Sequence, residues 1–96
     1  MQDFLAAFDA LPFGEFTGTA HGRRYVAVKS GFAGGASQKL VAEELGGTDY
    51  ISLNLYRTKA GALLRPCEMP EAKVIAFVRH LVVDAAPNGE RGVGSR

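Results

Sequence analysis

The spacing of apolar residues changes twice along this chain, and the two changes limit the folds open to it. Up to Pro12 apolar residues recur with the 3.6-residue period of a helix, and after it they alternate with a period of two. The helical period returns at Pro70. The sequence therefore predicts a helix at each end and strands between them.

The first helix is predicted between Asp3 and Leu11. Asp3 suits the N-cap, and Pro12 ends the helix because it disfavours helical backbone at the preceding residue. The apolar residues of one face fall at i, i+1, i+4 and i+7: Phe4, Leu5, Phe8 and Leu11.

Strands are predicted at 16–20, 24–29, 37–45, 50–58 and 63–67. Short glycine-containing pairs such as His21-Gly22 and Ala60-Gly61 mark the turns. The segment 50–58 alternates most regularly, which is typical of a half-buried strand. Pro66 confines the last strand to an edge of the sheet.

The segment 37–45 is open to two interpretations. Ser37 could cap a helix that Gly46 ends. However, Lys39 would lie in the first turn and Glu43 in the last, and both charges would oppose the helix dipole. We therefore favour a strand; the helical alternative would give the order αββαββα.

The last helix is predicted to begin at Pro70. Its apolar residues cover an arc of roughly 160°, whereas packing on one sheet needs only about 100°. The excess predicts a second contact, either with the first helix or with another subunit. The arc comprises Val74, Ile75, Phe77, Val78, Leu81, Val82 and Ala85.

These elements predict an α+β fold in which a meander of about five antiparallel strands carries the N-terminal and C-terminal helices on one face. One domain is expected over residues 1–86, since 96 residues leave no room for two. Residues 87–96 are polar and glycine-rich, and we expect this tail to be disordered.

Charge and cysteine content limit the function classes. Eleven Lys and Arg against ten Asp and Glu give a net charge of +1, without the basic excess typical of nucleic-acid binders. The single cysteine, Cys67, cannot form an internal disulfide. Neither a secretory leader nor an apolar run of about 20 residues is present, so we expect a cytoplasmic protein without a membrane partner.

Cys67 is the first candidate for chemistry, because it precedes a helix start and follows Arg65, a setting that can activate a thiol. Glu68 opposes that effect, and a catalytic pair with His21 would need the two side chains to be close. Two histidines and one cysteine do not predict a metal site. The glycines complete no nucleotide-binding motif, so we expect no cofactor.

Three functions remain open. We favour a non-enzymatic binding module that works as a homodimer, because its core is small and the last helix has a wide apolar arc. The second is a small enzyme or ligand-binding domain around Cys67. The third, which the net charge disfavours, is a nucleic-acid binder using a sheet face with Arg23, Arg24, Lys29, Tyr25 and Tyr56.

A possible interaction surface combines the sheet and the last helix. The polar side of segment 50–58 could continue onto the second strand, because tyrosines are favoured in interface cores. Its members would be Tyr25, Tyr50, Tyr56, Ile75 and Val82.

At residues 39–47, 49–56 and 64–70 the chain resembles small bacterial proteins that carry no assigned activity, cofactor or site. The likeness spans roughly residues 4 to 84. It implies a free-standing bacterial cytosolic protein and nothing about function.

Overall fold

A helix, five long strands, a second helix and a short sixth strand follow one another in the computed structural model, which describes residues 2–85. A single turn of 3-10 helix, η1 (Ala33–Gly35), joins the second and third strands. The remaining elements are α1 (Gln2–Ala10), β1 (Gly14–Ala20), β2 (Arg23–Phe32), β3 (Ser37–Glu44), β4 (Tyr50–Thr58), β5 (Gly61–Pro66), α2 (Glu71–His80) and β6 (Val82–Val83).

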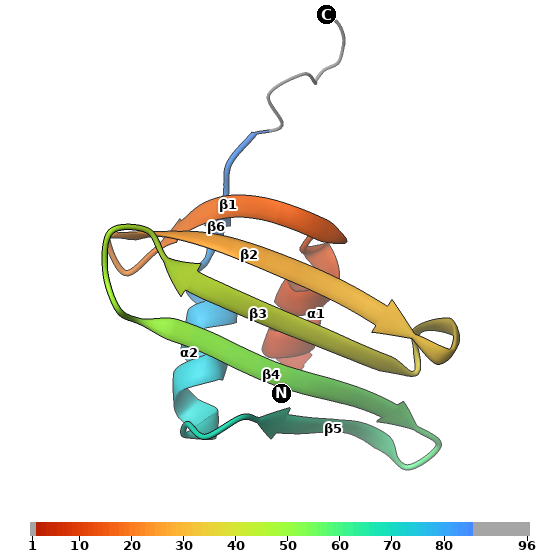
Figure 1. The fold of residues 1–96 in the computed structure, drawn as a ribbon. Helices are drawn as coiled ribbons and strands as arrows, with labels where there is room; N and C mark the ends of the chain where they lie inside the picture. Colours follow the sequence, from red (N-terminus) through yellow and green to blue (C-terminus); the bar gives the residue numbers. More distant parts are fainter. Residues whose placement is uncertain (1, 86–96) are drawn as a thin grey trace, which may run out of the picture.

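The strands form one antiparallel sheet in the order β5-β4-β3-β2-β1-β6. The five predicted strands are present and pair as sequential hairpins, which confirms the α+β meander. The sixth strand was not predicted. It lies beside β1 because α2 carries the chain back beneath the sheet (Figure 1).

The ambiguous segment is a strand, so the αββαββα alternative is wrong. β3 pairs with β2 on one side and β4 on the other, with Val41 opposite Val28 and Ser52. Leu40 and Ala42 alternate into the core. A helix here would have left the backbone edges of both neighbouring strands unpaired.

The last helix is shorter than predicted, and this is a correction. It ends at His80, because Leu81 adopts an extended backbone and Val82 then pairs with Thr19. Gly18 allows this pairing, since a Cβ there would lie 2.7 Å from the carbonyl oxygen of Val82. The start is also displaced: Pro70 is the N-cap and not the first helical residue.

Both helices lie on one face of the sheet, as predicted (Figure 1). α1 and α2 contact each other, and α2 also contacts β4 and β5. Phe77 and Val78 of α2 are buried in the core with Phe4 and Phe8 of α1. The first helix therefore supplies the second contact that the wide apolar arc of α2 predicts.

The predicted disorder of residues 87–96 concerns a segment outside the described residues. No helix within residues 2–85 combines the length and the apolar character needed to cross a bilayer.

Candidate functional site

The face of the sheet opposite the helices is uncovered by any described element (Figure 1). Side chains alternate across a strand, so every second residue of β1 to β5 lies on it. At its centre Val28 lies opposite Val41, and Val26, two residues earlier on β2, lies opposite Glu43. Val28 is 46% exposed, although valine is a residue type that is usually buried. We call this surface the open face.

Charged and aromatic residues surround the valines of the open face. Lys39 and Glu43 lie two residues before and two after Val41 on β3. Both are exposed, and neither forms an ion pair with another described residue. Tyr50 lies opposite Glu43, and Tyr56 lies at the other end of β4. The open face therefore has an apolar centre with opposite charges on either side.

The prediction that Tyr25 and Lys29 join this surface is wrong. Both are 2% exposed and face the helices, whereas Val26 and Val28 take the outer side of β2. The Lys29 ammonium donates hydrogen bonds to the carbonyl oxygens of Phe8 (2.7 Å) and Leu11 (3.0 Å) at the end of α1. The Phe8 carbonyl oxygen also accepts from the Leu11 amide (3.1 Å), whereas the Leu11 carbonyl lies past the end of α1, where no amide of the helix reaches it. The end of α1 can therefore satisfy a buried lysine.

Tyr25 is held by a polar network on the helix side of the sheet. Its hydroxyl donates to Asp49 (2.7 Å), and the Lys73 ammonium donates to the same carboxylate (2.8 Å). Burial, followed by the bond to Asp49, raises the pKa of Tyr25 to about 12. The bonds from Lys73 and Tyr25 lower the pKa of Asp49. This network ties the β3–β4 turn to α2.

The other two residues of the predicted interaction surface separate. Ile75 is half-buried and packs against the core from α2. Val82 is 68% exposed on β6, beyond the edge of β1. Tyr50 and Tyr56 lie on the open face at opposite ends of β4, and Val82, which is paired with Thr19, faces the same side of the sheet at its β6 edge.

His21 does not lie near Cys67 in the structure. The Cys67 amide donates to the carbonyl oxygen of Ser52 on β4, and the Asn54 amide contacts its sulfur at 3.6 Å. His21 lies in the β1–β2 turn with its ring centroid 5.0 Å from that of His80. Since β3 and β2 separate β4 from β1, the structure does not assemble a Cys–His pair.

The neighbours of Cys67 point to no reaction either. Arg65 lies on the open face opposite Asn54, and Glu68 follows Cys67 with a positive φ of 60°. Arg65 forms no ion pair with another described residue. The four candidates Cys67, Glu68, Arg65 and His21 therefore do not converge on one cavity in the described part of the chain.

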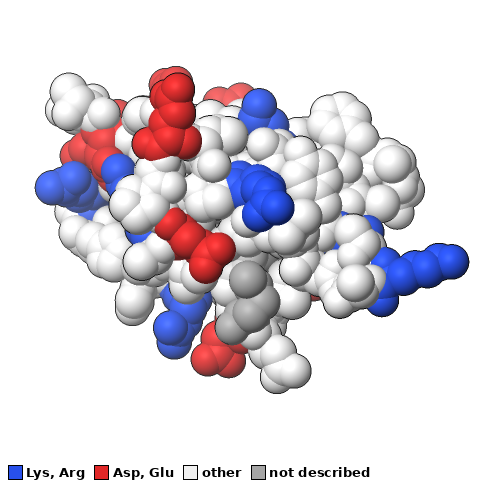
Figure 2. Space-filling model, turned by 90° about the horizontal axis from the view of Figure 1, so that it is seen from below, with Lys and Arg blue, Asp and Glu red and all other residues white. Residues whose placement is uncertain are grey.

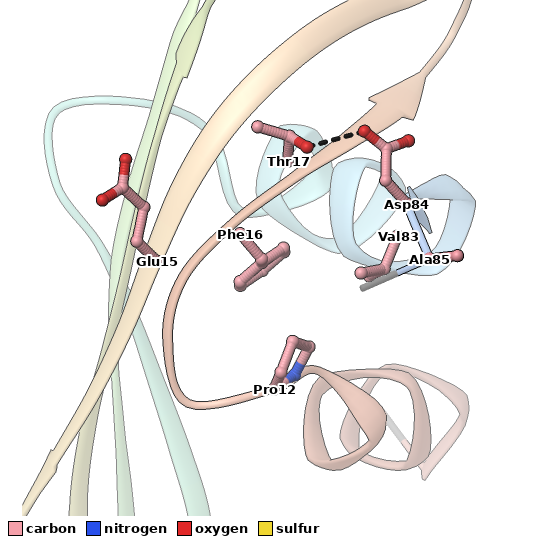
Figure 3. A pocket seen from close by; sticks show the side chains of 7 residues that line it. All are labelled: Pro12, Glu15, Phe16, Thr17, Val83, Asp84 and Ala85. Carbon is pink, nitrogen blue, oxygen red and sulfur yellow. Dashed lines mark hydrogen bonds between the residues drawn. The ribbon is translucent and has the colours of Figure 1, made fainter. Parts of the chain in front are cut away.

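A cavity of about 420 Å³ opens at the opposite edge of the sheet. Figure 3 shows Phe16, Pro12 and Val83 around it, with Glu15 directed away. At its rim Thr17 donates a hydrogen bond to Asp84 (2.6 Å). The sequence did not predict this cavity, because the cavity depends on β6. The two adjacent β-branched residues, Val82 and Val83, were the signal that could have predicted that strand. The full lining is Pro12, Glu15, Phe16, Thr17, Val83, Asp84 and Ala85.

The rim is fixed by an ion pair. Arg24 donates to both carboxylate oxygens of Asp84, at 2.9 and 2.5 Å, and to the Thr19 hydroxyl at 2.9 Å. These bonds, with the one from Thr17, hold the pKa of Asp84 well below its usual range. Arg24 is thus engaged with the β6 connection.

On the side of the molecule that carries the helices, Lys and Arg do not form a basic stripe. Figure 2 shows Lys and Arg interspersed with Asp and Glu when the molecule is seen from below. Of the residues in the nucleic-acid hypothesis, Arg23 pairs with Glu44 and Arg24 with Asp84, while Lys29 and Tyr25 are buried. Within residues 2–85 no three His, Cys, Asp or Glu side chains gather closely enough to hold a metal ion.

No protein-family model, curated protein sequence or solved structure matches the chain. The resemblance to small bacterial proteins therefore stays a prediction.

Proposed function

We propose that the chain is a non-enzymatic binding module that works as a homodimer, with the open faces of two copies stacked on each other. The observation that carries this proposal is a valine stripe on an uncovered sheet face, in which Val28 is 46% exposed and Val26 and Val41 are half-buried. Antiparallel sheets often leave one face to water, but that face is then polar. Contiguous apolar patches instead mark interaction sites.

The charges on either side of Val41 favour a second copy as the partner. A two-fold axis midway between the stacked sheets, passing over Val41 and perpendicular to β3, would place Lys39 of one copy opposite Glu43 of the other. The same operation repeats the contact in reverse, as isologous dimers require. One surface thereby supplies both halves of the charge complementarity.

The area of the open face is sufficient for a dimer. The five strands of the open face, at a spacing of about 4.8 Å, span about 19 Å, and the eight residues of β3 span about 26 Å. Each copy then contributes about 500 Å² of planar area, and the pair about 1,000 Å², the least that a specific interface needs. Stacked sheets pack about 10 Å apart, which valine side chains from both copies can fill.

We place the dimer in the cytoplasm. Cys67 is a free, half-buried thiol whose sulfur accepts a contact from Asn54, and a reducing compartment preserves it.

Sedimentation velocity over a concentration series tests the proposal. We expect a dimer at micromolar concentration. Lys39→Glu and Glu43→Lys should each weaken the dimer roughly tenfold, because each puts like charges opposite one another. The double variant K39E/E43K should recover the wild-type dissociation constant. Lys59→Glu, in the exposed β4–β5 turn, is the matched control.

Two results would refute the proposal. A wild-type protein that stays monomeric at high micromolar concentration excludes the homodimer. A double variant that dimerises no more tightly than either single variant would exclude the two-fold arrangement at Val41.

A further inference from the structure

β6 covers only part of the outer edge of β1. β1 has seven residues, and β6 pairs with two of them, Gly18 and Thr19. One further backbone bond follows, from the Asp84 amide to the Thr17 carbonyl oxygen (2.9 Å). No described residue returns a bond to the Thr17 amide, so the two chains diverge at this point.

Beyond this point the backbone of β1 offers further free groups. Backbone polar groups alternate between the two sides of a strand, so Glu15 directs its amide and carbonyl outward as Thr17 does. Within residues 2–85 these groups have no backbone partner on that side. The edge from Gly14 to Phe16 is therefore able to accept another strand.

The apolar cavity lies beside this free edge. Its walls on the helix side are Pro12, Phe16 and Val83 (Figure 3). Gly14 contributes no side chain to that face, and nothing lies within 4 Å of the position a Cβ would take. A strand residue opposite Gly14 could thus direct a large apolar side chain into about 420 Å³ of space.

The charged residue of this edge, Glu15, lies on the side of the sheet opposite the cavity. Glu15 is exposed on the open face and forms no ion pair with a described residue. A strand residue opposite Glu15 would place its own side chain next to this carboxylate. A basic side chain suits that position.

We propose that the free edge of β1 binds an extended peptide by strand addition, and that the preferred peptide alternates large apolar residues with Lys or Arg. Main-chain bonds to Glu15 and Thr17 hold the peptide, the cavity takes the apolar side chain, and Glu15 pairs with the basic one. This division of roles is general for strand addition.

Two-dimensional amide NMR of the full chain tests the proposal. The probe is an acetylated hexapeptide of alternating Val and Arg, and the comparison is the same peptide with Glu in place of Arg. We expect shifts concentrated at residues 14–17, and affinity about fivefold higher for the basic peptide. A basic peptide N-methylated on alternate residues keeps its charge but should not bind.

Two variants separate charge from packing. Glu15→Lys should reverse the preference in favour of the acidic peptide, and Glu71→Lys, on the exposed start of α2, should leave it unchanged. Equal binding of the N-methylated peptide, or shifts confined to other strands, would overturn strand addition.

Residues 86–96, which follow Ala85 in the sequence, are the alternative occupant. Hydrogen exchange of the free protein distinguishes them. We expect the Glu15 and Thr17 amides to exchange rapidly and to become protected with peptide. Protection of both amides without peptide, together with no peptide shifts, would assign the edge to the chain itself and overturn the proposal. Because these readouts concern β1 alone, they can fail while the dimer is confirmed.

Discussion

Replacing Lys29 with methionine tests whether its buried ammonium holds α1 on the sheet. Methionine keeps an unbranched apolar stem of similar length but removes the charge and the donors. The ammonium donates two hydrogen bonds to α1 carbonyls and lies 4.6 Å from the ring centroids of Phe8 and Phe13. All of these contacts would be lost in Lys29→Met.

The magnitude follows from the groups left behind. The Phe8 carbonyl oxygen keeps a second partner, the Leu11 amide at 3.1 Å, but the Leu11 carbonyl oxygen loses the Lys29 ammonium as its donor. An unsatisfied buried carbonyl costs about 1–3 kcal/mol, and the lost cation–π contacts add about 1 kcal/mol. Release of the buried ammonium offsets part of this. We expect Lys29→Met to lower the free energy of unfolding by about 2 kcal/mol.

The pH dependence supplies a second signature. Burial lowers the pKa of Lys29 below its usual value of 10.5. Between the lowered value and 10.5 the unfolded chain binds a proton that the folded chain does not. The contribution of Lys29 to stability therefore rises with pH through that window. The difference between wild type and Lys29→Met should be larger near pH 10.5 than at neutral pH.

Urea unfolding followed by far-ultraviolet circular dichroism measures both quantities. The midpoint should fall while the dependence on urea stays constant, as expected when only stability changes. Lys59→Met, in an exposed turn, is the control and should stay within about 0.5 kcal/mol of wild type. If Lys29→Met were no less stable than Lys59→Met at neutral pH, the role assigned to the ammonium would be refuted.

Three further predictions concern the sheet and its polar network. The pKa of Tyr25 is raised from 10.0 to about 12, so its contribution to the free energy of unfolding is complete below pH 10.0 and is lost as the pH rises to 12. Tyr25→Phe should remove this alkaline loss of stability, measured by urea unfolding at each pH. The pKa of Asp49 is lowered, so its contribution to the free energy of unfolding is complete above pH 3.8 and is lost as the pH falls below that value. Asp49→Asn should therefore make the free energy of unfolding less dependent on pH in the acid range. Gly18→Ala should cost about 1–3 kcal/mol, because the new Cβ meets the Val82 carbonyl oxygen, and should remove amide protection in β6; unchanged protection there would contradict the proposed close approach.

Local patterns were sufficient where one element alone decides the outcome. Pro12 ends α1, which runs to Ala10, and His21 with φ of 52° and Gly22 with φ of 76° form the predicted tight turn. Charges opposed to the helix dipole favoured a strand at 37–45, and β3 occupies Ser37–Glu44. These features depend on neighbours in sequence, so periodicity and turn chemistry suffice to predict them.

The faces of β2 could not be assigned in the same way. Its two alternating sets, one with Tyr25 and Lys29 and one with Val26 and Val28, both contain apolar atoms. Hydrophobicity alone would bury the valines. The polar partners that make Tyr25 and Lys29 acceptable in the core are Asp49 and the end of α1, which are remote in sequence.

The open face depends on the outward orientation of the β2 valines, and the cavity depends on β6. The apolar stripe of the open face exists because the valines are outside. The cavity exists because α2 stops at His80 and the chain returns to β1, and nothing local in residues 81–85 requires that pairing.

The sequence by itself determined α1, the five long strands, the start of α2 to within a residue and the antiparallel meander, because each follows from contacts between residues close along the chain. Tertiary structure decided which side of β2 is buried, where α2 ends and which edge of β1 stays free. The reason is that a polar side chain can be buried only where the folded chain brings it a partner, and such partners here come from distant elements.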